Sequence, residues 1–268
     1  MDPLTPLRPM SEHHIPHRER LLRRLDDIGR SLAARPTALA LLGLGSVGRE
    51  LNRLDDYSDL DFFVIVESGH KPAYLADLSW LGAAHPLAYA FHNSADGHKF
   101  LFADGIYGEM AVFAPEELAT VGYAPGRFVW RREGVPESWA APPVWPPRRE
   151  RVEAEWLLGE ALTNLYVGLC RYRRGEKLSA FRFIQQYAVD RVLDLVAGAE
   201  GADDPGGDTF DKPRRFEQRY PAVAPELPAM MPGYDRSPES AAAILAWLEA
   251  SYPVDPVMKR AIGDLLAS

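Results

Sequence analysis

The sequence predicts two domains of different classes: an α/β (α+β) N-terminal domain with a mixed sheet, and a C-terminal all-α helical bundle. Three observations predict this division. The first half mixes apolar strand-like runs with helical periodicity, a proline-dense passage follows it, and the remainder repeats apolar residues at helical spacing alone. We therefore expect the first domain over residues 1–140 and the second over residues 148–268 of the 268-residue chain.

The first domain opens with a helix. Residues 1–18 carry several prolines and predict a poorly ordered arm, whereas residues 19–34 place Leu21, Leu25 and Ile28 on one helical face. This helix ends before Pro36, because the residue ahead of a proline disfavours the helical conformation. A second helix is predicted over residues 72–81.

The sheet is predicted from short apolar runs that Gly and Asp turns separate. The segments with this pattern are 37–44, 59–66, 87–92, 98–103 and 107–113. A mixed sheet with helices packed on it is the natural way to bury such runs.

The second domain follows a stiff linker. Five prolines between residues 136 and 147 exclude a helix or a central strand there. Beyond them, residues 151–172 and 178–198 predict two long helices joined near Gly175, and shorter helices are predicted near 238–250 and 256–266, with a loop at 202–208.

The residues suited to chemistry are concentrated in a turn and the strand after it. Gly45 and Ser46 form a small turn, and Asp59 and Asp61 follow at the head of an apolar run. Side chains alternate along a strand with a period of two, so both carboxylates point to one face and can reach one divalent cation. Mg²⁺ prefers hard oxygen ligands and is usually held by one or two carboxylates together with substrate phosphates. We predict a metal site at Asp59 and Asp61.

Glu109 is the candidate third carboxylate. It interrupts an apolar strand, where an ionised side chain is costly unless it is paired or binds a metal. If this strand lies beside the one that carries Asp61, Glu109 joins the cluster as a metal ligand or as a general base toward a substrate hydroxyl. The competing interpretation is a partly exposed edge-strand acid paired to an arginine.

The Gly45–Ser46 turn supplies the phosphate side of the predicted site. Small residues allow close backbone approach, and a helix that begins near Ser46 would point free N–H groups at a phosphate. Arg49 is the predicted partner of the distal phosphates, and Arg53 is the weaker candidate.

These residues resemble a known family. Gly45-Ser46, the later Asp59-Leu60-Asp61-Phe62 and Gly108-Glu109 are similar to the motifs of the DNA polymerase β-like nucleotidyltransferase superfamily. The pattern most resembles the lincosamide nucleotidyltransferases, and next the aminoglycoside adenylyltransferases. It covers roughly residues 38–118, and the helical half matches in architecture only. The resemblance implies that Asp59 and Asp61 bind Mg²⁺-nucleotide, that Glu109 is the catalytic base, and that the helical domain contributes to the cleft for the acceptor.

The leading expectation is a Mg²⁺-dependent nucleotidyltransferase that moves AMP from ATP, or the monophosphate of another nucleoside triphosphate, onto a hydroxyl of a small-molecule antibiotic and so gives resistance. The net charge of -8 argues against sequence-blind attraction to nucleic acid and suits a cationic small molecule better. The longest apolar segment is far shorter than the ~20 residues that span a bilayer. We therefore expect no membrane partner and a cytoplasmic location. The oligomeric state is left open, with a homodimer as one alternative.

Two other functions stay open. The same chemistry would act on a protein or tRNA in a toxin-like or regulatory enzyme. The non-enzymatic alternative is a nucleotide-binding module without turnover, which the presence of all three carboxylates disfavours.

Overall fold

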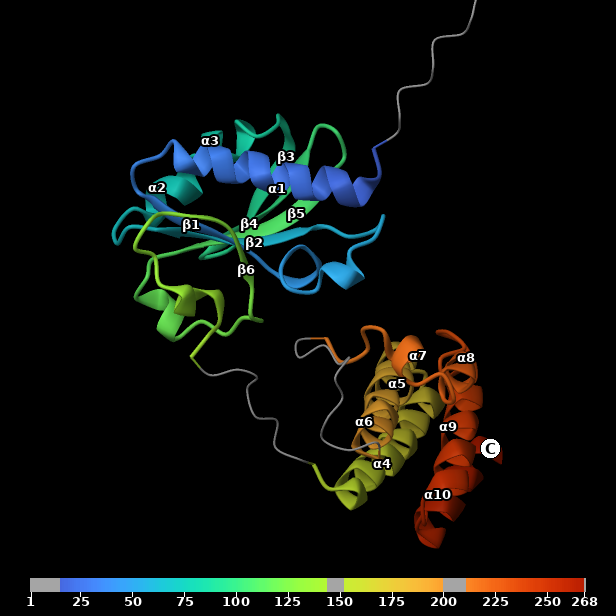
Figure 1. The fold of residues 1–268 in the computed structure, drawn as a ribbon. Coiled ribbons are helices and arrows are strands. Elements are labelled where there is room, and N and C mark those ends of the chain that lie inside the picture. The colour runs from blue at the N-terminus through green and yellow to red at the C-terminus, as the bar shows by residue number, and fades with distance from the viewer. Residues whose placement is uncertain (1–14, 144–151, 200–210, 268) are drawn as a thin grey trace, which may run out of the picture. The chain divides into compact units, whose positions relative to one another are not determined.

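The computed structural model describes residues 15–143, 152–199 and 211–267, which belong to two compact units (Figure 1). The first unit is Met1–Arg148 and the second is Arg149–Ser268. Most of the predicted arm, the distal part of the proline-dense linker and the predicted loop at 202–208 lie outside the described residues.

The first unit is built on a six-stranded sheet with the order β3-β4-β5-β2-β1-β6. The strands are β1 Ala38–Gly43, β2 Leu60–Val66, β3 Leu87–Ser94, β4 Gly97–Phe102, β5 Tyr107–Phe113 and β6 Arg127–Arg131. β2 and β5 are parallel, and all other neighbours are antiparallel. This arrangement confirms the predicted mixed sheet and its fold class. β6, which pairs with β1 at one edge, was not among the predicted strands.

One face of the sheet is covered by α1 (His17–Ala33), as Figure 1 shows. Leu21, Leu25, Ile28 and Leu32 are fully buried on this helix and pack in one core with strand residues such as Phe62. The amphipathic helix predicted for this region is confirmed. Part of the opposite face is covered by the segment after β5, which includes the 3-10 turns η3 (Glu117–Ala119) and η4 (Glu137–Ala140).

The helix predicted over 72–81 is two short helices, α2 (Lys71–Ala76) and α3 (Ser79–Gly82). The chain is extended at Asp77, whose carboxylate accepts a hydrogen bond from the Ser79 N–H at 2.8 Å. Aspartate side chains compete in this way with the helical backbone bonds and so divide the segment.

The second unit is entirely helical in its described part, which confirms the predicted class of this half. Its helices are α4 Ala154–Arg173, α5 Lys177–Phe181, the π-helix η5 Arg182–Ala188, α6 Val189–Ala199, α7 Phe216–Arg219, the 3-10 turn η6 Ala224–Glu226, α8 Leu227–Met230, α9 Ser237–Ser251 and α10 Pro256–Ala267. The helix predicted over 178–198 is therefore continuous but contains a π-helical stretch. Among the described residues no helix combines the length and apolar character needed to span a bilayer.

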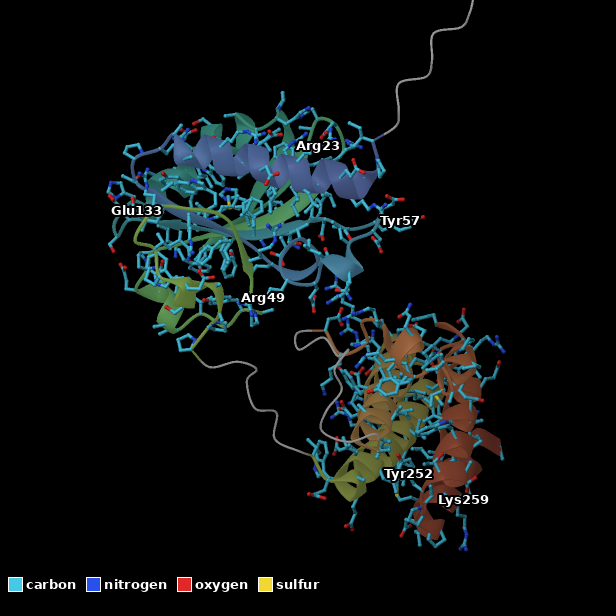
Figure 2. The ribbon with its side chains drawn as sticks, in the orientation of Figure 1. Arg23, Arg49, Tyr57, Glu133, Tyr252 and Lys259 are labelled. Atoms are coloured by element: carbon cyan, nitrogen blue, oxygen red, sulfur yellow. The ribbon has the colours of Figure 1, made fainter. Side chains whose placement is uncertain are left out.

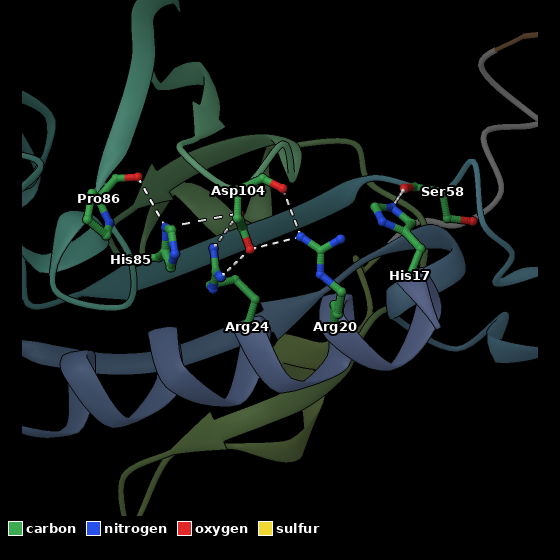
Figure 3. A network of polar contacts seen from close by, with 7 residues as sticks. All are labelled: His17, Arg20, Arg24, Ser58, His85, Pro86 and Asp104. Atoms are coloured by element: carbon green, nitrogen blue, oxygen red, sulfur yellow. Dashed lines mark hydrogen bonds and ion pairs between the residues drawn. The ribbon is translucent and has the colours of Figure 1, made fainter. Parts of the chain in front are cut away.

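A polar network fixes α1 to the end of the sheet that carries Asp59 (Figure 3). Asp104, in the turn between β4 and β5, accepts hydrogen bonds from Arg24 at 2.8 Å and from Arg20 at 3.0 Å. His17 Nε2 lies 2.9 Å from the Ser58 carbonyl oxygen, one residue ahead of Asp59. The first turns of α1 are thereby joined to two of the loops that border the predicted site.

Burial raises the pKa of Asp104, but the hydrogen bonds from Arg24 and Arg20 outweigh it and lower the pKa from 3.8 to about 2. A carboxyl whose pKa is lower in the folded chain stabilises the fold above its unfolded pKa and loses that contribution as pH falls. We expect Asp104→Asn to reduce the free energy of unfolding by about 2 kcal/mol at pH 7. Urea unfolding measures this difference.

The difference between wild type and Asp104→Asn should fall to about half near pH 3, because the ionised form is then less favoured. Asp26→Asn, an exposed acid on the same helix, is the matched control and should change little. A pH-independent difference would contradict the assignment of the effect to ionised Asp104.

Candidate active site

The register of the sheet places Asp61 directly opposite Glu109. β2 and β5 are parallel neighbours, and Asp61 and Glu109 are Cα partners in this pairing. Glu109 was expected to join the aspartates if its strand lay beside the strand that carries Asp61. This adjacency of β5 and β2 is confirmed. Asp59 lies one residue before β2 and so reaches the same end of β5, next to Tyr107.

The local sequence explains why these acids face away from the α1 core. Leu60 and Phe62 are fully buried on the α1 side, so alternation sends Asp61 to the opposite face, where it is exposed. Gly108 is required for this close pairing, because a Cβ there would lie 2.5 Å from Phe100 Cζ and 2.9 Å from Leu60 Cβ. Glu109 follows on the same face as Asp61.

Glu109 is held by two donors. Its Oε1 lies 2.6 Å from Lys99 Nζ on β4 and accepts a hydrogen bond from the Tyr107 hydroxyl at 3.0 Å. The hydrogen bond to Glu109 raises the pKa of Lys99, and burial followed by the bond to Glu109 raises the pKa of Tyr107. Both donors thus keep their protons at neutral pH. Glu109 is partly exposed and ion-paired, as the competing interpretation predicted, but it lies on an interior strand and its partner is a lysine instead of an arginine.

The carboxylates fit a metal that a nucleotide brings with it. Among the described residues, no three His, Cys, Asp or Glu side chains are grouped so that they could hold a metal ion by themselves. Mg²⁺ is usually bound through one or two carboxylates, with phosphate oxygens and water completing the shell. Asp59 and Asp61 on one face match that smaller donor set.

The Gly45–Ser46 turn lies beside Asp61. The Leu44 N–H donates to the Asp61 carbonyl oxygen at 2.8 Å, and Gly43 pairs with Phe62. Gly45 has a φ of +51°, a conformation that favours glycine. The structure therefore brings together the turn and the carboxylates at one end of the sheet.

The helix expected to begin near Ser46 is only a three-residue 3-10 turn, η1 (Gly45–Val47), and η2 (Leu51–Arg53) follows it. The chain turns back sharply at Gly48, where a Cβ would lie 2.5 Å from the Gly43 carbonyl oxygen. This turn ends the helix before it can form a full α-helical turn. The Gly48 N–H donates to the Gly45 carbonyl oxygen, so the N–H groups of Gly45, Ser46 and Val47 precede the first bond of η1.

Two arginines clamp this turn to β6. Arg49, which is exposed in Figure 2, donates from Nε to the Gly126 carbonyl oxygen at 2.9 Å. In return Arg127 donates to the carbonyl oxygens of Gly48 at 3.2 Å and Val47 at 3.1 Å. Arg53 instead pairs with Glu50. Arg127 was not a candidate from sequence, because the strand that carries it was not predicted.

A pocket of about 640 Å³ opens beside the clamp. Arg49, Arg127 and Arg131 line it together with the aromatic rings of Phe128 and Trp130. Arg131 pairs with Glu137, which is the acid in the pocket wall. The pocket thus places positive charge next to the turn that was predicted to bind phosphates.

Comparison of the sequence with protein-family models and with curated proteins finds no match. Among solved structures, the chain is similar to an aminoglycoside 6-adenyltransferase from Bacillus subtilis, with 14% identity over 92% of this chain and 91% of the other and a TM-score of 0.32. It is also similar to the STING-associated CdnE c-di-GMP synthase from Capnocytophaga granulosa, with 12% identity over 94% and 78% and a TM-score of 0.34. A third is the Bradyrhizobium diazoefficiens CD-NTase CdnG in complex with GTP, with 13% identity over 92% and 98% and a TM-score of 0.28.

The contact between Tyr107 and Glu109 predicts a shift that NMR can detect. In Glu109→Gln the negative charge is lost, so the pKa of Tyr107 should fall toward its ordinary value of 10.0. Titration of the tyrosine Cζ resonances at alkaline pH measures this pKa. The resonance that is missing in Tyr107→Phe identifies Tyr107. Tyr123, whose pKa is raised by burial alone, is the internal control and should not move. An unchanged Tyr107 midpoint would contradict the contact.

The clamp predicts that Arg127→Ala loosens the turn. Hydrogen bonds from charged donors contribute about 1.5–3 kcal/mol, so we expect hydrogen exchange to accelerate at least tenfold over residues 44–50. Arg131→Ala is the matched control, because it removes an arginine from the same pocket but not from the turn. Equal exchange in the two variants would show that Arg127 does not hold the turn.

Proposed function

We propose that the first unit is the catalytic unit of a nucleotidyltransferase. The juxtaposition of Asp61 and Glu109 on neighbouring parallel strands, beside the Gly45–Ser46 turn, carries this proposal. Transfer of a nucleoside monophosphate needs a place for phosphates, carboxylates for a divalent cation and a base near the acceptor hydroxyl. Residues suited to each task lie at one end of this sheet.

Glu109 is the proposed general base. Lys99 and Tyr107 fix its carboxylate by holding Oε1. As the acceptor oxygen forms its bond to the α-phosphorus, the hydroxyl proton passes to Glu109 and the bond to pyrophosphate breaks. Because the hydroxyl must lie within hydrogen-bond reach of the base, the fixed position of Glu109 defines where the acceptor reacts.

Asp59 and Asp61 are the residues that would hold Mg²⁺, which when bound offsets negative charge on the phosphates. Ser46 and the N–H groups at the start of η1 are the proposed phosphate donors. The guanidinium of Arg49 is anchored through Nε to Gly126, and its other N–H groups are the proposed contact to the distal phosphates.

The finer part of the proposal concerns the substrates. We infer transfer of AMP from ATP onto a hydroxyl of a small-molecule antibiotic, a lincosamide or an aminoglycoside, with resistance as the result. Its support is the resemblance of Gly45-Ser46, Asp59, Asp61 and Glu109 to the motifs of those transferases.

The test is pyrophosphate release with Mg²⁺, each of the four common nucleoside triphosphates and a panel of antibiotics. We expect turnover with ATP, its loss when EDTA removes the metal, and a fall of at least about a hundredfold in Asp61→Asn and Glu109→Gln. Asp56→Asn, the same type of change at an exposed acid in the same loop, is the matched control and should retain activity.

Wild-type turnover in folded Asp61→Asn would contradict the proposed mechanism. The effect on cells carrying the gene separates the acceptors: a small-molecule antibiotic predicts resistance, whereas a protein or tRNA acceptor predicts growth arrest. ATP binding without pyrophosphate release for any acceptor would identify a module that binds nucleotide without turnover.

A further inference from the structure

Large aromatic side chains lie exposed on β5, which carries Glu109, and on β3, two strands away. Tyr89 is 57% exposed, Phe91 44% and Tyr107 37%. The Tyr89 and Phe91 rings lie 5.9 Å apart between centroids, at an angle of 48°. Exposed apolar groups that occur together on a surface often mark a binding site.

The sheet register places these rings in line with the carboxylates. Phe91 on β3 pairs with Lys99 on β4, Lys99 pairs with Glu109 on β5, and Glu109 pairs with Asp61 on β2. Directly opposite residues in a sheet share a face, so all four side chains lie on the side away from α1. This first row runs from an aromatic ring to the proposed metal site.

A second row lies parallel to the first, toward the same end of the sheet as Asp59. Tyr89 pairs with Leu101, and Leu101 pairs with Tyr107, whose hydroxyl donates to Glu109. Tyr89, Phe91, Leu101 and Tyr107, which we name the ring platform, therefore surround the Lys99–Glu109 pair with apolar surface. Lys99 and Glu109 themselves remain 36% and 39% exposed, so this part of the face is open within the described part of the first unit.

The position of the proposed nucleotide site relative to Glu109 indicates what this surface would bind. Asp61 and the Gly45–Ser46 turn lie on the β2 and β1 side of Glu109, which is the side proposed for the nucleotide. An acceptor whose hydroxyl reaches Glu109 can extend in the other direction, over β4 and β3, where the described part of the first unit leaves the face exposed. Neighbouring strands are about 4.8 Å apart, so the platform extends about 10 Å from Glu109.

We propose that the ring platform is the acceptor site, and that the acceptor is a small molecule with an aromatic ring within about 10 Å of its reactive hydroxyl. This inference rests on the proposed nucleotidyltransferase reaction and not on the proposed antibiotics. Lincosamides and aminoglycosides carry no aromatic ring, so an aromatic acceptor is an alternative to them for the same reaction. Lys99 and Glu109 form an ion pair with no net charge, so the surface selects by ring shape and apolar contact rather than by charge.

Phenyl β-D-glucoside and methyl β-D-glucoside are the probes, because they carry the same sugar hydroxyls and differ in the presence of an aromatic ring. Their dissociation constants are measured by ligand-observed NMR with the full chain, without nucleotide. We expect the phenyl compound to bind at least about tenfold more tightly, since stacking on aromatic side chains contributes about 1–3 kcal/mol per ring. The double variant Tyr89→Ser, Phe91→Ser should remove this difference.

Tyr57→Ser is the matched control, because Tyr57, labelled in Figure 2, is 96% exposed on the first unit but lies between η2 and β2, outside the strands of the platform. It should keep the preference for the phenyl compound. Equal affinity of wild type for both glucosides, or a preference that survives the double variant, would overturn the inference. A change of sedimentation in the double variant with an unchanged ring preference would instead identify this face as an interface between copies.

Failure of this inference is distinguishable from failure of the proposed function. Pyrophosphate release and ATP binding are measured on the same samples, and the glucoside affinities do not depend on them. Turnover with acceptors that lack an aromatic ring, at rates that the double variant does not change, would overturn the acceptor role of the ring platform. The proposed transferase function would still hold. Ring binding without ATP binding or turnover would reject the transferase and overturn the acceptor role of the platform.

Discussion

The parallel pairing of β2 with β5 is the constraint on which the rest of the first unit depends. Leu60 and Phe62 enter the α1 core on one side of this pair, and Asp61 and Glu109 meet on the other. Because alternation has a period of two, a shift of one residue in either strand would send a carboxylate into the core. The buried apolar residues therefore fix the register, and the register fixes the relative position of the acids. Gly108 is part of the same constraint, because a larger residue there would collide with Phe100 and Leu60.

Loops at the same end of the sheet are tied to this pair by polar bonds. The Leu44 N–H joins the Gly45–Ser46 turn to Asp61, and the clamp between Arg49, Arg127 and their carbonyl partners joins the turn to β6. On the other side of the sheet, Arg24 and Arg20 bind Asp104, while His17 contacts the carbonyl of Ser58 (Figure 3). Partly buried charges are less costly when they are paired, so these bonds offset the burial of the arginines and also hold the loops. The Nε of Arg24 is an exception, because it is buried without a hydrogen-bond partner. The loops around the carboxylates are thus held in place by hydrogen bonds to helices and strands on both faces of the sheet.

Much of this fold could be predicted because its periodicity is strong, as in the helix that carries Leu21 and Ile28 and the strands that carry Phe62 and Met110. What the sequence could not supply was strand order, and only strand order brings Glu109 to Asp61. β6 was missed because its five residues begin and end with arginine and acquire their strand conformation by pairing with β1. Arg127 was missed together with β6. The signal in the sequence was the glycine at position 126, and the structure shows its reason, because a Cβ there would lie 2.7 Å from the Gly43 carbonyl oxygen. The prediction of a helix beginning near Ser46 was wrong for a local reason, because the chain turns back at Gly48 and passes close to the Gly43 carbonyl oxygen.

β3 is an edge strand, and its pairing with β4 is interrupted by register shifts near both ends. Such irregularities twist an exposed edge and hinder the addition of another strand. Tyr89 and Phe91 lie in the regular stretch between these shifts, two strands away from Glu109. A substitution on β3 consequently alters the apolar surface without altering the pairing of β2 with β5. Under the proposed assignment, the residues that select the acceptor and those that carry out nucleotidyl transfer lie on separate strands, so a lineage with this architecture could change its acceptor while it keeps its reaction.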